Sequence, residues 1–388
     1  MKNIIMTLLL IITSGVSQTK KNPIDKSIEF IDVYKNQLSE RGFTIGGSYE
    51  AGFSKNTHGG IDTDGTSNKQ RLTLNLSLSL DKLIGLEGGT VFFQYQNHHG
   101  SFATDEVGDI QQFDGLDDPE YNRIHMFWYE QWLFGKKARF KIGKVEPKSE
   151  FFGPIYAKNH LGFSTERSPT IGHGPPANSV NLFLYPTKSL EFGFGIYDAA
   201  FNEGRDENDF RLHSLFSSPA DTFYLAEGRY KWDSGRFMAG YWYLDGDFNK
   251  LDGSGTQSSK DGFYLVLDQM VYKENNNKDD NQGIGIYLQY GYTDEDISSI
   301  KAHYGAGFQW TGAIPSRDED VWGMGVSHVD LSSDNTTFRD NYERAFEVFY
   351  KGKISKNLTL LYDMQFIENP SGQHTDALVH DLRVTFSF

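Results

Sequence analysis

The chain has 388 residues, of which 40 are Gly, 15% are aromatic and none is Cys, and its formal net charge is −15. The negative charge argues against a nucleic-acid partner, because phosphate binding needs a basic surface, and the absence of Cys excludes thiol chemistry and Cys-based metal sites. Mean hydropathy is −0.52, and no run approaches the roughly eighteen apolar residues of a membrane-spanning helix. The length of the chain allows one large β domain or two ordinary ones.

The first residues have the three parts of a secretory signal peptide. Lys2 precedes the apolar run Ile4–Ile12, and small residues follow as far as Ser17. The run is too short to be a spanning helix. We therefore expect a signal peptide over residues 1–18, with cleavage near Gln18, and export of the chain.

Residues 19–42 are predicted to hold a short amphipathic helix. Pro23 is a favourable first residue, Gly42 a favourable stop, and apolar residues recur every three or four positions between them. These are Ile24, Ile28, Ile31, Tyr34 and Leu38. Such a stripe cannot be buried by the helix alone, so we expect it to dock in or under the mouth of the domain that follows.

A long strand with one apolar face lies at residues 71–80. Its even-numbered positions, from Leu72 to Leu80, are all Leu, and the residues between them are Thr, Asn or Ser. Successive side chains of a strand point to opposite faces. About ten residues is long for a soluble strand but matches a tilted strand that crosses a bilayer. We expect lipid on the Leu face and water on the other.

From Phe43 onward, about sixteen alternating segments are joined by connections that are short and long in turn. The short ones include 135–137, 187–188, 233–235 and 355–357, and the long ones 55–69, 98–120, 147–178 and 199–220. Outer-membrane barrels have short periplasmic turns and long outer loops. Residues 43–388 are therefore predicted to form an all-β domain, a transmembrane antiparallel β-barrel of about 16 strands, in which the connection 273–281 fits least well.

Charged side chains are predicted to face the interior of this barrel. Alternation turns Arg139 and Lys141 inward on one strand, and Glu343, Glu347 and Lys351 inward on another. A sixteen-stranded barrel encloses an aqueous channel, and charges that line water cost little. The polar face therefore indicates a pore.

Segment 122–134 does not keep a single phase. Whichever phase is chosen, either Glu130 or Gln131 faces lipid, so we predict a β-bulge in this segment. The orientation of Arg123 depends on this bulge.

The longest connection, 147–178, is rich in aromatic residues. Extended in water it would leave its rings exposed, so we expect it to fold inward and narrow the pore. Arg139 and Lys141 would then supply hydrogen-bond donors, with Arg123 a third, and Glu150 an opposing acceptor. Phe151 or Phe152 would offer a face for stacking, a combination that suits a neutral, polyhydroxylated solute. Alternatively the rings only pack the loop onto the wall.

The last strand repeats the alternation and ends on an aromatic residue. Leu382, Val384, Phe386 and Phe388 alternate with polar residues. A terminal aromatic suits the interfacial girdle of a membrane barrel and resembles the signal that barrel-insertion machinery reads. A soluble barrel or sandwich that ends on Phe is the alternative.

No enzymatic motif is complete in the sequence. Gly193-Phe-Gly195 resembles part of a phosphate-binding loop, but no helix follows, and neither a Gly-x-Ser-x-Gly elbow nor a His-Glu-x-x-His motif occurs. The acidic stretches 62–65 and 114–118 lack complete calcium-loop spacing and are interpreted as solvated loops. We expect no catalytic residues, no cofactor and no metal site.

Four segments together resemble the carbohydrate-selective (OprB-like) porin family. They are Gly143-Lys-Val-Glu-Pro-Lys-Ser-Glu-Phe-Phe152, Tyr129-Glu-Gln-Trp132, Tyr304-Gly-Ala-Gly-Phe-Gln-Trp-Thr-Gly312 and Leu361-Tyr-Asp-Met-Gln-Phe-Ile-Glu-Asn-Pro370. The resemblance runs from about Ile28 to Phe388 and implies a sixteen-stranded barrel with an N-terminal helix and sugar uptake through an eyelet with Arg and acidic side chains. The chain departs from the family at Lys21-Asn-Pro23, where Trp-Gly-Gly is usual, and at Tyr362, where Pro is common, so the preferred sugar does not follow from the resemblance.

The sequence thus predicts an outer-membrane porin of a Gram-negative bacterium that passes small saccharides by passive diffusion. A general porin without a sugar site, a lipid-acting barrel enzyme and a closed adhesion barrel are the alternatives. Outer-membrane lipid and lipopolysaccharide are the expected surroundings. The sequence leaves open whether protomers stay single or form a homotrimer.

Overall fold

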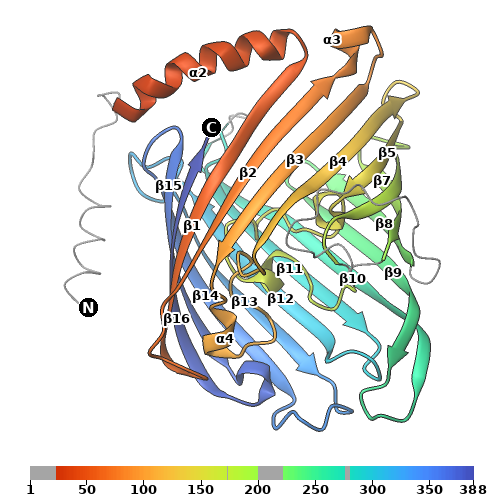
Figure 1. Cartoon of the computed structure of the whole chain (residues 1–388), viewed down its shortest axis with the longest axis vertical. Coiled ribbons are helices and arrows are strands. Elements are labelled where there is room, and N and C mark those ends of the chain that lie inside the picture. The colour runs from red at the N-terminus through yellow and green to blue at the C-terminus, as the bar shows by residue number, and fades with distance from the viewer. Residues whose placement is uncertain (1–22, 173, 200–221, 276–279) are drawn as a thin grey trace.

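The alternating segments form strands that pair antiparallel along the chain, and the last strand pairs with the first. In this computed structural model, which describes residues 23–172, 174–199, 222–275 and 280–388, they make a closed barrel of sixteen strands (Figure 1). This confirms the predicted fold class. The expected signal peptide, nearly all of the connection 199–220 and residues 276–279 of the connection 273–281 lie outside the described residues.

The strands in chain order are β1 (Phe43–Gly60), β2 (Ser67–Ser79), β3 (Gly89–Gly100), β4 (Tyr121–Leu133), β5 (Ala138–Val145), β6 (Ala177–Leu184), β7 (Leu190–Asp198), β8 (Thr222–Trp232), β9 (Gly235–Asn249), β10 (Thr256–Lys273), β11 (Gly283–Thr293), β12 (Ile300–Thr311), β13 (Val321–Leu331), β14 (Tyr342–Lys353), β15 (Leu358–Glu368) and β16 (Thr375–Ser387). The helices are α2 (Pro23–Glu40), α3 (Leu80–Ile84), α4 (Thr104–Val107) and α5 (Phe163–Glu166), with 3₁₀ turns η1 (Pro147–Ser149) and η3 (Pro370–Gly372). Within these described ranges, no helix is both long enough and apolar enough to cross a bilayer.

The Leu row of β2 lies on the outer wall. Lys69 is 0% exposed and Thr73 8%, so the odd-numbered side chains face the packed interior, whereas Leu74 is 39% exposed on the other face. Leu74 pairs with Gly47 of β1 and Tyr95 of β3. The predicted phase of this strand is therefore confirmed.

The two ends of the barrel differ as the connection lengths predicted. Turns of two to five residues join β4 to β5, β6 to β7, β8 to β9 and β14 to β15. Helix α2, helix α3 and the C-terminus lie at this short-turn end (Figure 1). Long connections leave the opposite ends of the same strands.

Helix α2 begins at Pro23 as predicted and ends just before Gly42, whose φ of 96° favours glycine. It lies on the short-turn rim, where Asp32 pairs with Lys356 at 2.5 Å and Lys82 Nζ donates to the Ser39 carbonyl at 2.6 Å. Tyr34, a member of the predicted apolar stripe, is 52% exposed. The helix therefore touches the rim without burying this part of its stripe in the barrel mouth.

The bulge predicted for segment 122–134 is present in β4, at His125. Gln94 of β3 pairs with Met126, while the adjacent Tyr95 pairs with Ile124, so His125 is the extra residue. The phase change lets both Arg123 and Glu130 face inward. Gln131 faces outward at the short-turn rim, where its amide donates to the Glu87 carbonyl at 2.8 Å.

Two long connections fold into the barrel. Residues 101–120 bury Val107, Phe113 and Leu116, and residues 146–176, here called the constriction loop, bury Phe151 and Phe152. The inward folding predicted for the constriction loop is confirmed. The two segments leave part of the bore open, and the candidate site lies there.

Candidate solute-binding site in the bore

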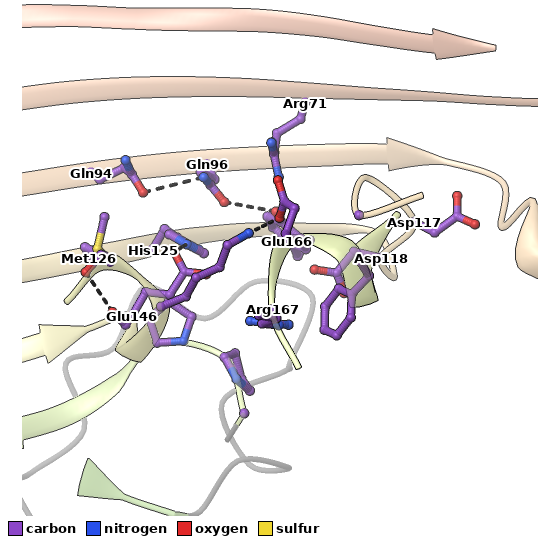
Figure 2. A pocket seen from close by; sticks show the side chains of 18 of the residues that line it. Arg71, Gln94, Gln96, Asp117, Asp118, His125, Met126, Glu146, Glu166 and Arg167 are labelled. Carbon is purple, nitrogen blue, oxygen red and sulfur yellow. Dashed lines mark hydrogen bonds and ion pairs between the residues drawn. The ribbon is translucent and has the colours of Figure 1, made fainter. Parts of the chain in front are cut away.

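A cavity of about 470 Å³ lies between the wall formed by β2, β3, β4 and β16 and the two inward-folded connections. Wall side chains and loop side chains converge on it from opposite sides (Figure 2). The wall contributes Arg71, Gln94, Gln96, Tyr121, Arg123, His125 and Arg383, and the connections contribute Asp117, Asp118, Glu146, Lys148, Glu166 and Arg167. The lining is therefore rich in hydrogen-bonding groups of both charges.

A chain of amides and hydroxyls runs along the wall beneath the charged groups. Tyr121 OH donates to Gln96 Oε1 at 3.0 Å, Gln96 Nε2 to Gln94 Oε1 at 3.5 Å, and Gln94 Nε2 to Asn75 Oδ1 at 2.9 Å. Each of these side chains lies on an inward position of its strand. A rigid sheet thus fixes the donors and acceptors in space.

Each arginine of the cavity contacts a carboxylate or an aromatic ring that fixes its position. Arg71 pairs with Glu50 at 2.7 Å, and Arg383 pairs with Asp114. Arg123 lies 3.8 Å over the Tyr121 ring, and Arg167 lies 3.7 Å over the Phe163 ring. Because guanidinium groups cover these two rings, the cavity presents N–H edges to a solute on that side.

Arg139, Lys141 and Glu150, predicted as two donors and an opposing acceptor around a solute, pair directly with one another in one ionic cluster. Arg139 contacts Glu130 at 2.9 Å and Glu150 at 2.6 Å, and Lys141 contacts the same carboxylates at 3.1 and 2.5 Å. Their side chains are only 5–14% exposed. The cluster satisfies its own charges and ties the start of the constriction loop to β5. Of the predicted set, only Arg123 lines the main cavity.

Phe151 and Phe152 are buried, at 1% and 0% exposure. Phe151 packs on Phe183 with 5.3 Å between ring centroids, and Phe152 packs edge-on against Tyr264 at 5.7 Å. Neither ring offers an open face in this structure. These contacts correspond to the alternative in which the rings pack the loop onto the wall.

Carboxylates on the barrel wall hold the main chain of the constriction loop. Glu227 of β8 accepts from the Phe152 N–H at 2.9 Å, and Asp268 of β10 from the Ile155 N–H at 2.7 Å. Glu347 of β14 accepts from the Leu161 N–H at 2.5 Å. Three separate strands therefore fix the path of the loop across the bore.

Sequence reasoning missed most of the cavity lining. Arg71 and Arg383 lie on strands whose phase was readable, so alternation alone would have turned both inward. Lys148, Glu166 and Arg167 had no such signal, because they belong to the constriction loop, where no periodicity applies. Their placement follows from the contacts between the loop and the wall.

The acidic residues of segment 114–118 hold a lysine. Asp114 approaches Lys69 at 2.7 Å, and Asp117 contacts the same ammonium group. Burial disfavours ionisation of Asp114, but Arg383 and Lys69 outweigh it and keep the pKa of this loop carboxyl below its usual range. In the part of the chain that the structure describes, no group of three or more His, Asp or Glu side chains is arranged to hold a metal ion.

Comparisons with known proteins relate both the sequence and the fold to porins. The family model "Carbohydrate-selective porin, OprB family" matches residues 63–388. The high-pH structure of Pseudomonas putida OprB superposes with a TM-score of 0.85 at 17% identity, covering 92% of this chain and 97% of that one. Its low-pH structure gives a TM-score of 0.64 at 15% identity and covers 92% and 96%.

A mutant of the Rh. blastica porin shares the fold more distantly. Its TM-score is 0.53 at 11% identity, with 89% of this chain and 100% of that chain covered. A comparison with curated protein sequences gives no match. At these sequence identities the structural matches establish only the fold, whereas the match to the family model establishes the family.

Proposed function

The chain belongs to the OprB family of carbohydrate-selective porins, and we propose that it passes small saccharides across the outer membrane through the main cavity described above. The observation that carries this is the position of the cavity inside the bore, between a rigid polar wall and the constriction loop. Selectivity in such a channel comes from its width, its hydrogen-bond groups and its local field. No covalent step is involved.

The lining supports recognition of hydroxyl groups. Arg71, Arg123 and Arg167 present charged N–H donors, and Asp118 and Glu146 present acceptors across the same space. A sugar hydroxyl both donates and accepts, so it can bridge groups of opposite charge at little cost. A bare ion of either sign meets repulsion from one of the two sets.

We assign different roles to the residues predicted from sequence. Arg123 is proposed as a wall donor to the solute. Arg139, Lys141 and Glu150 are proposed to hold the base of the constriction loop, and Phe151 and Phe152 to seat it against the wall. The eyelet geometry is proposed to depend on these five residues, none of which lines the main cavity.

The ends of the chain have proposed roles in export and insertion. Residues 1–18 are proposed as a signal peptide removed near Gln18. Phe388 is proposed as the signal read by the barrel-insertion machinery; its main chain exchanges two 3.0 Å hydrogen bonds with Gly47 of β1. The apolar outer wall is proposed to lie in lipid and lipopolysaccharide.

Substituting Arg123→Ala tests the sugar site in planar-bilayer recordings. Losing one charged hydrogen bond of about 1.5 kcal/mol should raise the sugar concentration that half-blocks the current by about tenfold. Arg344→Ala is the matched control, because Arg344 pairs with Glu368 and does not line the cavity. If sugars of equal size but different stereochemistry block equally, and Arg123→Ala changes nothing, the protein is a general porin.

A further inference from the structure

Two parts of the constriction loop meet at an ion pair inside the main cavity. Lys148, on η1, contacts Glu166, on α5, through Nζ and Oε2. The two side chains are 29% and 27% exposed, and both line the main cavity. We call this contact the clasp. Neither of its residues is among the donors and acceptors proposed above for the solute.

Each side of the clasp belongs to a short turn that also carries a proposed sugar ligand. The Glu146 carbonyl accepts from the Ser149 N–H at 3.0 Å, so Glu146 and Lys148 share the turn of η1. Arg167 directly follows Glu166, and its N–H donates at 3.2 Å to the carbonyl of the first residue of α5. Glu146, Glu166 and Arg167 all line the main cavity (Figure 2). The clasp therefore joins the turn of an acceptor to the turn of a donor.

The two turns are anchored on different walls of the barrel. η1 follows β5, and Glu150, directly after η1, pairs with Arg139 and Lys141 of that strand. In α5, the Thr165 hydroxyl donates to Glu347 of β14 at 3.2 Å. β5 and β14 lie nearly half the circumference apart in the order of the strands. The clasp is thus a contact between two separately anchored parts of the loop.

This arrangement makes the clasp responsible for one distance in the site. Without it, Glu146 would follow the wall at β5 and Arg167 the wall at β14, and the separation of the two side chains would be free to vary. A binding site loses affinity when the residues that support its ligands hold them loosely. A partly exposed ion pair adds little to overall stability, and the wall carboxylates would still hold the loop. Loss of the clasp should therefore alter the site without unfolding the loop.

We propose that Lys148 and Glu166 are positioning residues of the sugar site, which hold Glu146 and Arg167 at the separation that sugar hydroxyls bridge. The inference rests on the proposed sugar function of the main cavity. The constriction loop then contributes recognition geometry as well as width. Lys148 and Glu166 act through each other, because each already has the other as its partner.

A double-mutant cycle in planar-bilayer recordings with glucose, galactose and fructose tests the clasp. Lys148→Met and Glu166→Gln should each raise the half-blocking concentration of a sugar that blocks the unmodified porin by about threefold, the usual scale for a partly exposed ion pair. Because both changes break the same contact, the double variant should block no more weakly than either single variant. Lys148→Arg keeps the cation and should be blocked as the unmodified porin is.

Lys250→Met is the matched control for the loss of an ion-paired lysine. Lys250 pairs with Asp296 at 2.8 Å, its side chain is 31% exposed, and it does not line the main cavity. Its removal should leave the half-blocking concentrations unchanged.

The outcomes separate this inference from the function on which it rests. Two threefold effects that multiply to about ninefold in the double variant overturn the clasp, because Lys148 and Glu166 then act independently of each other. Unchanged block in both single variants overturns it as well. Either result leaves the sugar channel in place, because sugar still blocks the current. Absence of block by all three sugars in the unmodified porin removes the sugar function itself.

Discussion

Two buried aspartates of the connection 101–120 have opposite electrostatic surroundings. Asp114 lies between Lys69 and Arg383, and these cations hold its carboxyl ionised. Asp109 is 5% exposed, and burial together with the charge of Glu343 raises the pKa of Asp109 well above its usual range. Asp114 therefore stabilises the connection through its ion pairs, whereas Asp109 destabilises it when its carboxyl is ionised.

Substituting Asp109→Asn should make the barrel more stable at alkaline pH. A carboxyl with a raised pKa in the folded state keeps its proton while the unfolded chain loses it, so stability falls as pH rises from about 4 toward the folded pKa. The loss is at most about 1.4 kcal/mol per pH unit. Urea-unfolding midpoints at pH 5 and pH 8 should therefore diverge less in Asp109→Asn than in the unmodified protein.

The matched control for this measurement is Asp105→Asn, on the exposed surface of α4 in the same connection. It should leave the pH dependence of the midpoint as it is in the unmodified protein. Equal pH dependence in Asp109→Asn and Asp105→Asn would contradict the raised pKa of Asp109.

At the scale of elements, carboxylates of the barrel wall hold the constriction loop at three points of its backbone. Glu227, Asp268 and Glu347 accept main-chain N–H groups, so the identity of the loop side chains matters little to these three bonds. A carboxylate that accepts backbone N–H groups makes strong, charge-assisted hydrogen bonds. The wall therefore sets the position of the loop, and with it the width of the eyelet.

Substituting Glu347→Ala should widen the eyelet and make its current noisier. The change removes the acceptor for the Leu161 N–H and for the Thr165 hydroxyl, which lies 3.2 Å away. Single-channel conductance should rise, and sugar block should weaken. Glu347→Gln keeps an acceptor oxygen and should restore much of the unmodified conductance, a rescue that loss of charge alone would not give.

Glu368→Ala provides the control on the neighbouring strand β15, because Glu368 pairs with Arg344. Its conductance should match that of the unmodified porin. If Glu347→Ala also matches, the constriction loop is held by its packed side chains.

Alternation predicted which side chains of the strands face inward, but not what they touch. Glu347 was turned inward correctly, yet its partner Leu161 lies 186 residues earlier in the chain. No local pattern encodes such a pairing. The position of the bulge within its segment was not predicted for a related reason. Met126, Phe127, Trp128 and Tyr129 separate His125 from Glu130 and suit either face of a barrel strand, so the sequence does not show where the phase changes.

The six predicted site residues show the same limit. Arg139 and Lys141 were expected to face Glu150 across a solute, whereas the three side chains pair directly with one another. Glu130 also pairs with Arg139 and Lys141, so these charges neutralise one another inside the cluster. The sequence did not predict this pairing, because the bulge leaves the orientation of Glu130 undetermined. Aromatic content predicted that the loop would fold inward. It could not tell a ring that faces solute from one that faces the wall.

The whole molecule depends on a wall whose two faces meet different solvents. Leu74 lies near the middle of β2 on the outer face, and Asn75 beside it lies on the inner face, where it accepts a hydrogen bond from Gln94. The outer side chains need lipid, and the inner ones need water or polar partners. The two neighbours should therefore respond very differently to the same charged substitution.

Substituting Leu74→Arg should destabilise the inserted barrel by about 2–4 kcal/mol, the cost of a lipid-facing Arg near the bilayer midplane. Asn75→Arg is the matched control, one residue away, and should be nearly neutral, because a charge inside the aqueous bore stays hydrated. The two free energies of unfolding are measured by unfolding both variants from lipid vesicles in urea. The folded and unfolded fractions are read from their different electrophoretic mobilities. Equal tolerance of the two substitutions would mean that β2 does not separate lipid from water, and the pore would lose its physical basis.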